Sequence, residues 1–171
     1  GGSIWDWVDQ GFLEIDEQGR KYYTYGGDYG PENVGSDGNF CCNGLLFPDH
    51  TPSPKMDEVK HVYQSIHVTE KNIVEGKFNL YNEYFFTNLN EFYIKWEITA
   101  NGEKIQSGRL EPIAMEPQIQ KELSVPIKKF VREPGKEYFF NIYFYTRHDD
   151  LIVKKDHFVA YNQLSFVNNP E

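Results

Sequence analysis

The stretch FYIKWEITANG, residues 92–102, decides the fold class of this chain. Its apolar side chains recur at every second position: Phe92, Ile94, Trp96 and Ile98. Successive side chains point to opposite faces of a strand, so this pattern predicts a strand with one buried face. The Asn-Gly pair at 101–102 follows directly, and this pair favours a two-residue hairpin turn.

Similar patterns recur from residue 65 to the end of the chain, without a helix between them. We expect strands at about 65–69, 72–86, 91–99, 103–110, 117–125, 137–147 and 152–167. The second range contains Gly76, where we expect a bend or bulge, and the last has room for two strands. Strands in this number predict an antiparallel β-sandwich. The Cys…Trp…Cys pattern of antibody domains is absent from the sequence, which favours a fibronectin-like form of the immunoglobulin-like sandwich.

Before residue 65 the sequence is rich in Gly, Asp, Asn and Pro and poor in strand patterns. SIWDWV, residues 3–8, predicts a short strand that is buried on both faces. DEQG, residues 16–19, predicts a hairpin turn between FLEI and KYYTY. The glycine-rich segment 25–44 predicts a long loop. Loops longer than about 12–15 residues are uncommon in compact domains, and they are usually functional or disordered.

A helix is expected after this loop. Pro54 suits the first helical turn and Ser53 can cap it, while Met56, Val59 and Tyr63 are spaced for one apolar face. We expect this helix to end near residue 64.

Composition excludes two classes of partner. The formal net charge is −9, whereas nucleic-acid binding needs clustered Lys and Arg. The sequence has no run of about 18 apolar residues, so we expect no membrane-spanning helix. Hydrophobic residues make up 39% of the chain and aromatic residues 16%, which is enough for a packed core.

Two aspartates and two tryptophans crowd the segment at residues 5–9. On a strand, Asp6 and Asp9 would point to opposite faces, so they cannot flank one glycosidic bond as an acid/base pair. Trp5 and Trp7 would share a face, and either a sugar-binding role or core packing is open to them.

Cysteine and histidine offer no recognisable metal motif. Cys41 and Cys42 are neighbours, and adjacent cysteines rarely form a disulfide, so we expect two free thiols. The five histidines are scattered without metal-ligand spacing: His50, His61, His67, His148 and His157.

Three segments of the first part resemble a known family. GGSIWDWVDQG (1–11), DEQGRKYYTYGGDYG (16–30) and GNFCCNGLLFPDHTPSPKMDEVKHVYQ (38–64) resemble the end of the catalytic barrel in bacterial β-galactosidases of glycoside hydrolase family 2. FTNLNEFYIKWEITANGEKIQSG (86–108) is similar to the immunoglobulin-like domain that follows the barrel in that family. The resemblance implies two domains: residues 1–64, the C-terminal remnant of a (β/α)₈ barrel, and residues 65–171, the sandwich.

The resemblance also implies a reaction. The family hydrolyses terminal β-D-galactose residues with retention, using one glutamate as acid/base and another as nucleophile. Both glutamates come from earlier barrel strands, so we expect no catalytic residue in this chain and no activity from the chain alone. It further implies a homo-oligomeric parent with a β-galactoside substrate; the residues do not identify a compartment.

Three positions match binding residues of the family. Trp5 matches a tryptophan that forms a platform in the galactosyl site. Phe40 matches a residue whose backbone carbonyl binds sodium, and Asn43 matches one whose side chain binds the same ion. Since a further carboxylate ligand lies upstream in the family, we expect weak sodium affinity here. Some members have a secondary magnesium contact at an asparagine, where this chain has Ser36; magnesium is expected as a possible cofactor of the parent.

Two other interpretations stay open on sequence grounds. The sandwich could be a stand-alone module for carbohydrate or protein, which an exposed platform of Trp and Tyr on one face would favour. It could also be a scaffold that spaces the barrel from its neighbours. If the chain is a barrel fragment, residues 1–50 are expected to pack on the sandwich in a non-native way, to pair with another copy, or to be loosely ordered.

Overall fold

The computed structural model describes residues 2–166. The chain divides into two compact units, Gly1–Val62 and Tyr63–Glu171. The fold is mainly β, as expected, and its sheets are antiparallel.

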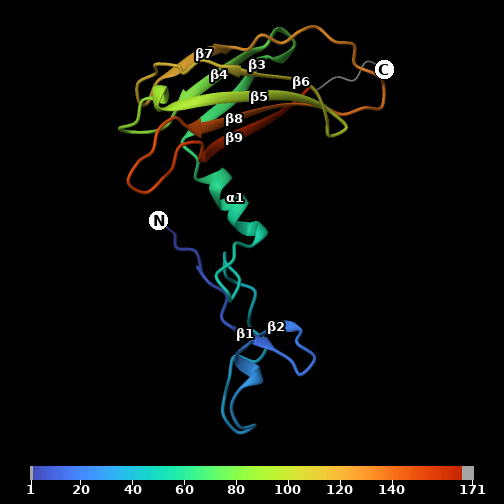
Figure 1. The fold of residues 1–171 in the computed structure, drawn as a ribbon, viewed down its shortest axis with the longest axis vertical. Helices are drawn as coiled ribbons and strands as arrows, with labels where there is room; N and C mark the ends of the chain where they lie inside the picture. Colours follow the sequence, from blue (N-terminus) through green and yellow to red (C-terminus); the bar gives the residue numbers. More distant parts are fainter. Residues whose placement is uncertain (1, 167–171) are drawn as a thin grey trace. The chain divides into compact units, whose positions relative to one another are not determined.

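The second unit is a sandwich of two antiparallel sheets. One sheet has the order β3–β4–β7 and the other the order β6–β5–β8–β9. In Figure 1 these sheets form two layers, with β3, β4 and β7 in the upper one. The strands of the first sheet are β3 (Ile66–Asn72), β4 (Lys77–Asn82) and β7 (Gln120–Ser124). Those of the second are β5 (Phe92–Ala100), β6 (Glu103–Leu110), β8 (Tyr138–Thr146) and β9 (Phe158–Ser165). The expected sandwich is therefore confirmed.

The core lies between the two layers. Phe78 of β4 and Phe140 of β8 stack with ring centroids 4.3 Å apart, and both side chains are fully buried. Trp96 of β5 lies against the same Phe140 ring at 6.3 Å. Each buried side chain of this size stabilises the fold by about 1.5–3 kcal/mol relative to its exposure. The apolar side chains at alternate positions of residues 92–98 thus lie on the face of β5 that points into the core, as the sequence predicted.

The hairpin at residues 101–102 is confirmed. Asn101 has a φ of 47° and Gly102 a φ of 83°, the positive values that a two-residue turn of this kind requires. The ladder between β5 and β6 continues from Ala100↔Glu103 to Ile94↔Leu110.

Three expected strands are clearly shorter than the sequence suggested, and in the range 117–125 only β7 forms. The range 72–86 contains a 3₁₀ turn, η2 (Ile73–Glu75), before β4, because Asn72 accepts a hydrogen bond from the Glu75 N–H through its side chain and Gly76 takes a φ of 68°. In the range 152–167 only β9 forms, and residue 167 lies outside the described residues. The segment before β9 forms a turn instead of a strand, in which the Asp150 N–H donates to the Val153 carbonyl at 2.8 Å. A further 3₁₀ turn, η3 (Leu89–Glu91), precedes β5.

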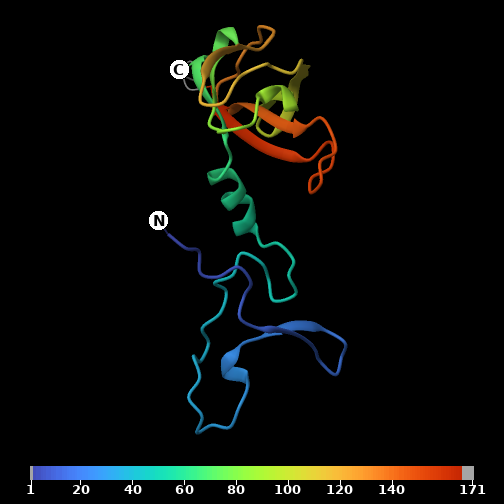
Figure 2. The same ribbon diagram turned by 90° about the vertical axis from the view of Figure 1, so that its left-hand side faces the viewer.

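The first unit contains little regular structure. Its elements are β1 (Phe12–Ile15), β2 (Lys21–Thr24), the 3₁₀ turn η1 (Gly26–Asp28) and α1 (Pro54–Val62). The hairpin of β1 and β2 is confirmed and extends as an arm of this unit in Figure 2. Its turn is held by Asp16, whose Oδ1 accepts from the backbone N–H groups of Gln18 and Arg20.

The strand expected at residues 3–8 does not form. Only Val8 makes a bridge, parallel to Leu46, although backbone hydrogen bonds continue on both sides of it. A buried parallel strand needs neighbours on both edges and both faces. Among the described residues of the first unit this segment has a single partner segment, so the ladder is not extended.

The prediction that the Ser53 side chain caps the helix is also wrong. The Ser53 Oγ is buried and has no hydrogen-bond partner among the described residues; its backbone carbonyl instead accepts from the Met56 N–H at 2.9 Å. The helix ends at Val62, two residues before the expected end, and contains no buried residue.

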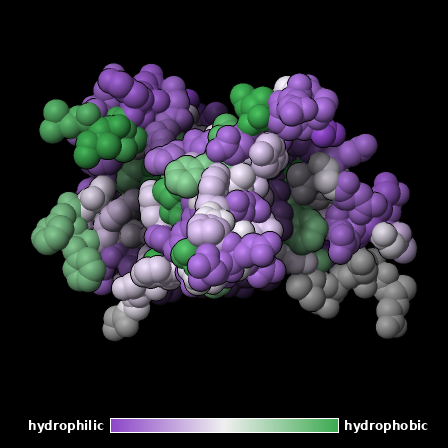
Figure 3. All heavy atoms as spheres, turned by 90° about the horizontal axis from the view of Figure 1, so that it is seen from below, coloured by the Kyte–Doolittle hydropathy of each residue, from purple (hydrophilic) through white to green (hydrophobic). Residues whose placement is uncertain are grey.

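The first unit has almost no core of its own. Among its described residues, Leu45 is the one apolar side chain that is buried. Large apolar side chains are exposed instead, including Trp5 (71%), Trp7 (56%) and Phe12 (66%). Figure 3, which draws both units, shows apolar residues, in green, at the surface among hydrophilic ones. Across residues 2–166, no helix is both long and apolar enough to cross a membrane.

Candidate functional site

Two segments of the first unit are joined by backbone hydrogen bonds. The Asp6 N–H donates to the Asn43 carbonyl at 2.9 Å, and the Leu45 N–H donates to the Asp6 carbonyl at 3.0 Å. Gly44 lies so close to the other segment that a Cβ there would be 2.0 Å from the Asp9 nitrogen. The structure thus brings the backbone of Asn43 beside the residue that follows Trp5.

The two carboxylates of this segment bind backbone groups. Asp9 Oδ1 accepts from the Gly44 N–H at 2.6 Å, and Asp6 Oδ1 accepts from the Trp7 N–H at 2.6 Å. The hydrogen bond of Asp9 joins two distant segments and so fixes the loop. Asp9 and Gly44 are therefore positioning residues that sequence reasoning missed; their spacing of 35 residues gave no local signal.

Asn43 has the side chain that a cation ligand needs. Both its Oδ1 and its Nδ2 are buried, and neither has a hydrogen-bond partner among the described residues. Leaving a buried polar group unpaired costs about 1–3 kcal/mol, so native folds usually supply a partner. An amide oxygen is a suitable ligand for a hard cation such as sodium.

Phe40 lines a hollow of about 400 Å³ in the same unit. Phe12 and Tyr29 line it too, and their rings meet edge to face at 5.9 Å. The Tyr29 hydroxyl is 2.6 Å from the Thr24 Oγ1, which ties this wall to β2. The hollow is therefore aromatic on one side. Ser36 also lines it.

Trp5 does not line that hollow, and its side chain is 71% exposed. The structure places Trp5 beside the Asn43 segment through the Asp6 backbone but does not gather Trp5 and Phe40 around one cavity. An exposed indole of this size is suited to stacking on an apolar face of a ligand.

The two thiols lie between Phe40 and Asn43. The Sγ atoms of Cys41 and Cys42 are 3.7 Å apart, and both cysteines are free, as expected. The hydrogen bond between the thiols, followed by desolvation, raises the pKa of Cys41. Lys55 donates from Nζ to the Cys42 carbonyl at 2.9 Å and links α1 to this loop, a contact that the sequence did not suggest.

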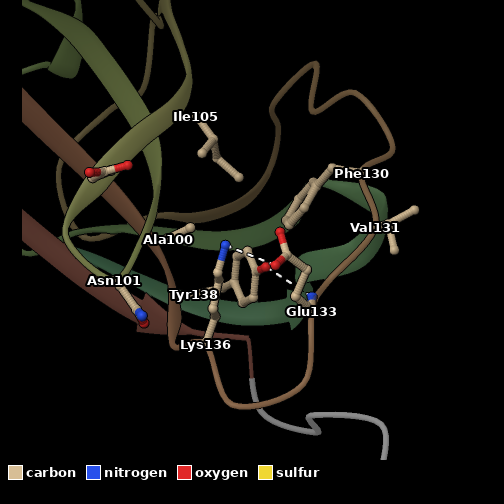
Figure 4. Close-up of a pocket in the computed structure, with 9 residues that line it drawn as sticks. Ala100, Asn101, Ile105, Phe130, Val131, Glu133, Lys136 and Tyr138 are labelled. Atoms are coloured by element: carbon tan, nitrogen blue, oxygen red, sulfur yellow. Dashed lines mark hydrogen bonds and ion pairs between the residues drawn. The ribbon is translucent and has the colours of Figure 1, made fainter.

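The sandwich has a hollow of its own, of about 380 Å³, shown in Figure 4. Its carboxylate at Glu133 is paired with Lys136 at 2.9 Å, and the Glu133 N–H donates to the Tyr138 hydroxyl at 2.9 Å. The Glu133 carboxylate raises the pKa of Lys136 through the hydrogen bond and through its charge. These groups satisfy one another, which is typical of a structural ion pair.

Tyrosines cluster on the outer face of the larger sheet, but protein groups cover their rings. Tyr93 and Tyr145 are opposite each other across β5 and β8 and stack at 5.2 Å. Arg109, on the β6 side, lies 4.2 Å from the Tyr93 ring centroid, and Lys95 lies 4.9 Å from that of Tyr145. Stacked and cation-capped rings do not form the flat, open platform that a sugar-binding sandwich would present.

Comparison with known proteins matches the chain to two family models. Residues 1–68 match the family model described as glycosyl hydrolases family 2, TIM barrel domain, and residues 78–167 match that described as β-galactosidase, domain 4. A β-galactosidase of Pseudoalteromonas haloplanktis is 33% identical over 99% of this chain, and one of Alteromonas mediterranea is 34% identical over 98%. A β-galactosidase of Priestia megaterium is 46% identical over 62% of the chain.

The chain spans 16% of the first two relatives and 10% of the third. The barrel match explains why residues 2–62 expose so many apolar side chains, since barrel helices and strands are normally covered on both sides. The chain belongs to the β-galactosidases of glycosyl hydrolase family 2 and matches the TIM barrel domain with its first 68 residues and domain 4 with residues 78–167.

Proposed function

We propose that this chain is part of a retaining β-galactosidase that hydrolyses terminal β-D-galactose residues of β-galactosides. The observation that carries the proposal is the match of residues 1–68 to the barrel domain of a glycosidase family, with relatives named β-galactosidase. In this proposal the chain supplies one wall of the galactosyl site and part of a sodium site.

Each role rests on a feature of the residue. Trp5 offers an exposed indole on which the apolar face of a galactosyl ring can stack. The Asn43 side chain, buried without a partner, and the Phe40 carbonyl supply two oxygen ligands for sodium. When bound, the ion would supply a fixed positive charge that orients oxygen atoms of the sugar. Because two protein ligands are few for a hard cation, the chain alone should bind sodium weakly. Magnesium stays a possible cofactor of the parent, but the proposal assigns no residue of this chain to it, because Ser36 stands where the family has an asparagine.

The chain alone should not hydrolyse galactosides. A retaining glycosidase needs two carboxyl groups about 5–5.5 Å apart, one of them an acid whose pKa is raised, commonly by an apolar pocket. The glutamates of the first unit are all solvent-exposed: Glu14, Glu17, Glu32 and Glu58. Asp6 and Asp9 each accept a hydrogen bond from a backbone N–H.

A segment exchange tests the proposal. Residues 1–171 replace the matching segment of the Pseudoalteromonas haloplanktis β-galactosidase, which aligns with 99% of this chain. We expect the hybrid to hydrolyse a chromogenic β-galactoside and the isolated chain to give only the rate of a blank. Trp5→Ala in the hybrid should lower kcat/KM by about a hundredfold or more, because it removes contacts to the sugar in the transition state.

Two controls make the result interpretable. Trp7→Ala changes a neighbouring exposed tryptophan to which no role is assigned, and it should cost much less than Trp5→Ala. Asn43→Ala should raise the sodium concentration needed for half-maximal activity. A folded hybrid without activity, or equal losses for the two tryptophan variants, would contradict the proposed roles.

A further inference from the structure

The thiols of Cys41 and Cys42 converge although they are neighbours in sequence. Side chains of adjacent residues point in opposite directions in extended backbone. Cys42, however, has a φ of 62°, in the left-handed region that few residues other than glycine adopt. This conformation turns its side chain toward Cys41, and the two Sγ atoms are 3.7 Å apart.

This separation matches a metal chelate. In a tetrahedral site with metal–sulfur bonds of about 2.3 Å, two sulfur ligands lie about 3.8 Å apart. A disulfide would instead need the sulfurs at about 2.05 Å. The same separation is that of the thiol–thiol hydrogen bond, so one soft ion that replaced the protons would bind both sulfurs with little movement.

The surroundings hold the loop in this conformation. Lys55 is hydrogen-bonded to the Cys42 carbonyl through its Nζ, which fixes the backbone of the unusual residue. Cys42 is exposed, so an ion can reach the pair from solvent.

We propose that Cys41 and Cys42 form a chelating dithiol for a soft divalent ion of the cadmium and zinc class. Binding releases one proton from each thiol to solvent, and the two thiolates balance the charge of the ion. In residues 2–166 no group of three or more His, Cys, Asp or Glu side chains is placed to hold a metal, so water completes the coordination shell. The site does not depend on galactosidase activity.

Cadmium alone is the probe. The full chain, kept reduced with a phosphine, is titrated with Cd²⁺ while the thiolate-to-cadmium charge-transfer absorption is recorded. We expect one ion per chain, and Cys41→Ser or Cys42→Ser should each weaken binding by about a hundredfold. Val34→Ser, in the same loop, is the matched control and should bind like the unaltered chain.

A synthetic peptide of residues 38–45 separates a built site from any pair of adjacent thiols. Because the fold already places the sulfurs, the chain should bind cadmium about tenfold more tightly than the peptide. Equal affinity of chain and peptide, one ion per two chains, or unchanged binding by the double serine variant would each overturn the proposal. The far-ultraviolet circular dichroism of each variant shows that the sandwich is folded.

Discussion

Gly108 shows how one missing side chain shapes the core. It lies on β6 opposite Trp96 of β5, and a Cβ at this position would stand 2.7 Å from the indole Nε1 and 2.8 Å from Cε2. The indole therefore packs over bare backbone. The glycine is required by this close approach and not by its φ, which is not in the left-handed region.

Gly108→Ala should lower the free energy of unfolding by about 1–3 kcal/mol, since the added methyl group displaces a buried tryptophan. Urea denaturation followed by tryptophan fluorescence measures the change. Ser107→Ala alters the next residue of the same strand, on the other face, and should have little effect. An unchanged midpoint for Gly108→Ala would mean that Trp96 is not packed against this position.

The ionisation of Tyr143 makes the stability of the sandwich depend on pH in the alkaline range. Its hydroxyl donates to Glu97 Oε1 at 3.0 Å, and desolvation together with this carboxylate raises the pKa of Tyr143 from 10.0 to about 12. The neutral phenol is thus favoured in the folded state. This contribution to stability is fully present below pH 10 and is lost as the pH rises from 10 through about 12.

Tyr143→Phe should therefore flatten the fall in stability over that pH range, as measured by urea denaturation at several pH values. Glu97→Gln keeps the phenol but removes the negative charge, so its fall in stability should be intermediate. A parallel decline of Tyr143→Phe and the unaltered chain would show that the phenol is not linked to folding.

At the scale of elements, the sequence correctly predicted the features that depend only on neighbouring residues. The alternation in residues 92–98 and the Asn-Gly turn were sufficient for β5 and its hairpin, because burial of one face and two positive φ values depend on adjacent residues. The turn at Asp16 was predictable for the same reason. Of the candidate site, Trp5, Phe40 and Asn43 came from a family resemblance, and their roles stay predictions.

The predictions that failed concern features that depend on contacts between segments far apart in the sequence. The segment 3–8 has the composition of a buried strand, yet it forms a single bridge, because it has one partner segment among the described residues of its unit. The approach of Gly44 to Asp9 crosses 35 positions and leaves no periodic trace in the sequence. Ser53 has the right residue type for a cap, but its hydroxyl is buried without a partner.

Gly44→Ala tests the pairing of residues 6–9 with 43–46. The new Cβ would meet the Asp9 nitrogen at 2.0 Å and the Val8 carbonyl carbon at 2.5 Å, so the two segments must separate. We expect faster amide exchange at Leu45 and Asp9, whose N–H groups donate across this pairing.

Gly35→Ala is the control, because a Cβ there has no atom within 4 Å and the pairing should persist. Exchange rates that respond equally to both substitutions would show that the pairing does not depend on the close approach.

At the scale of the whole chain, the two units differ in what holds them. The sandwich buries a continuous cluster that includes Phe78, Phe140 and Phe144, whereas Leu45 is the one buried apolar side chain among the described residues of the first unit. Since apolar burial is the main favourable term in folding, cooperative stability should reside in the sandwich.

Amide exchange over the whole chain should therefore fall into two classes. Amides of β5 and β8 should exchange only through global unfolding, because they lie in the middle of a four-stranded sheet over the core. Amides of residues 2–50 should exchange orders of magnitude faster, since their opening exposes little apolar surface that was buried. Removal of residues 1–62 should leave the urea midpoint of the sandwich unchanged. Slow exchange in residues 2–50 of a monomer would mean that contacts other than a core of its own stabilise this part of a barrel. Sedimentation of the same sample establishes that the chain is a monomer.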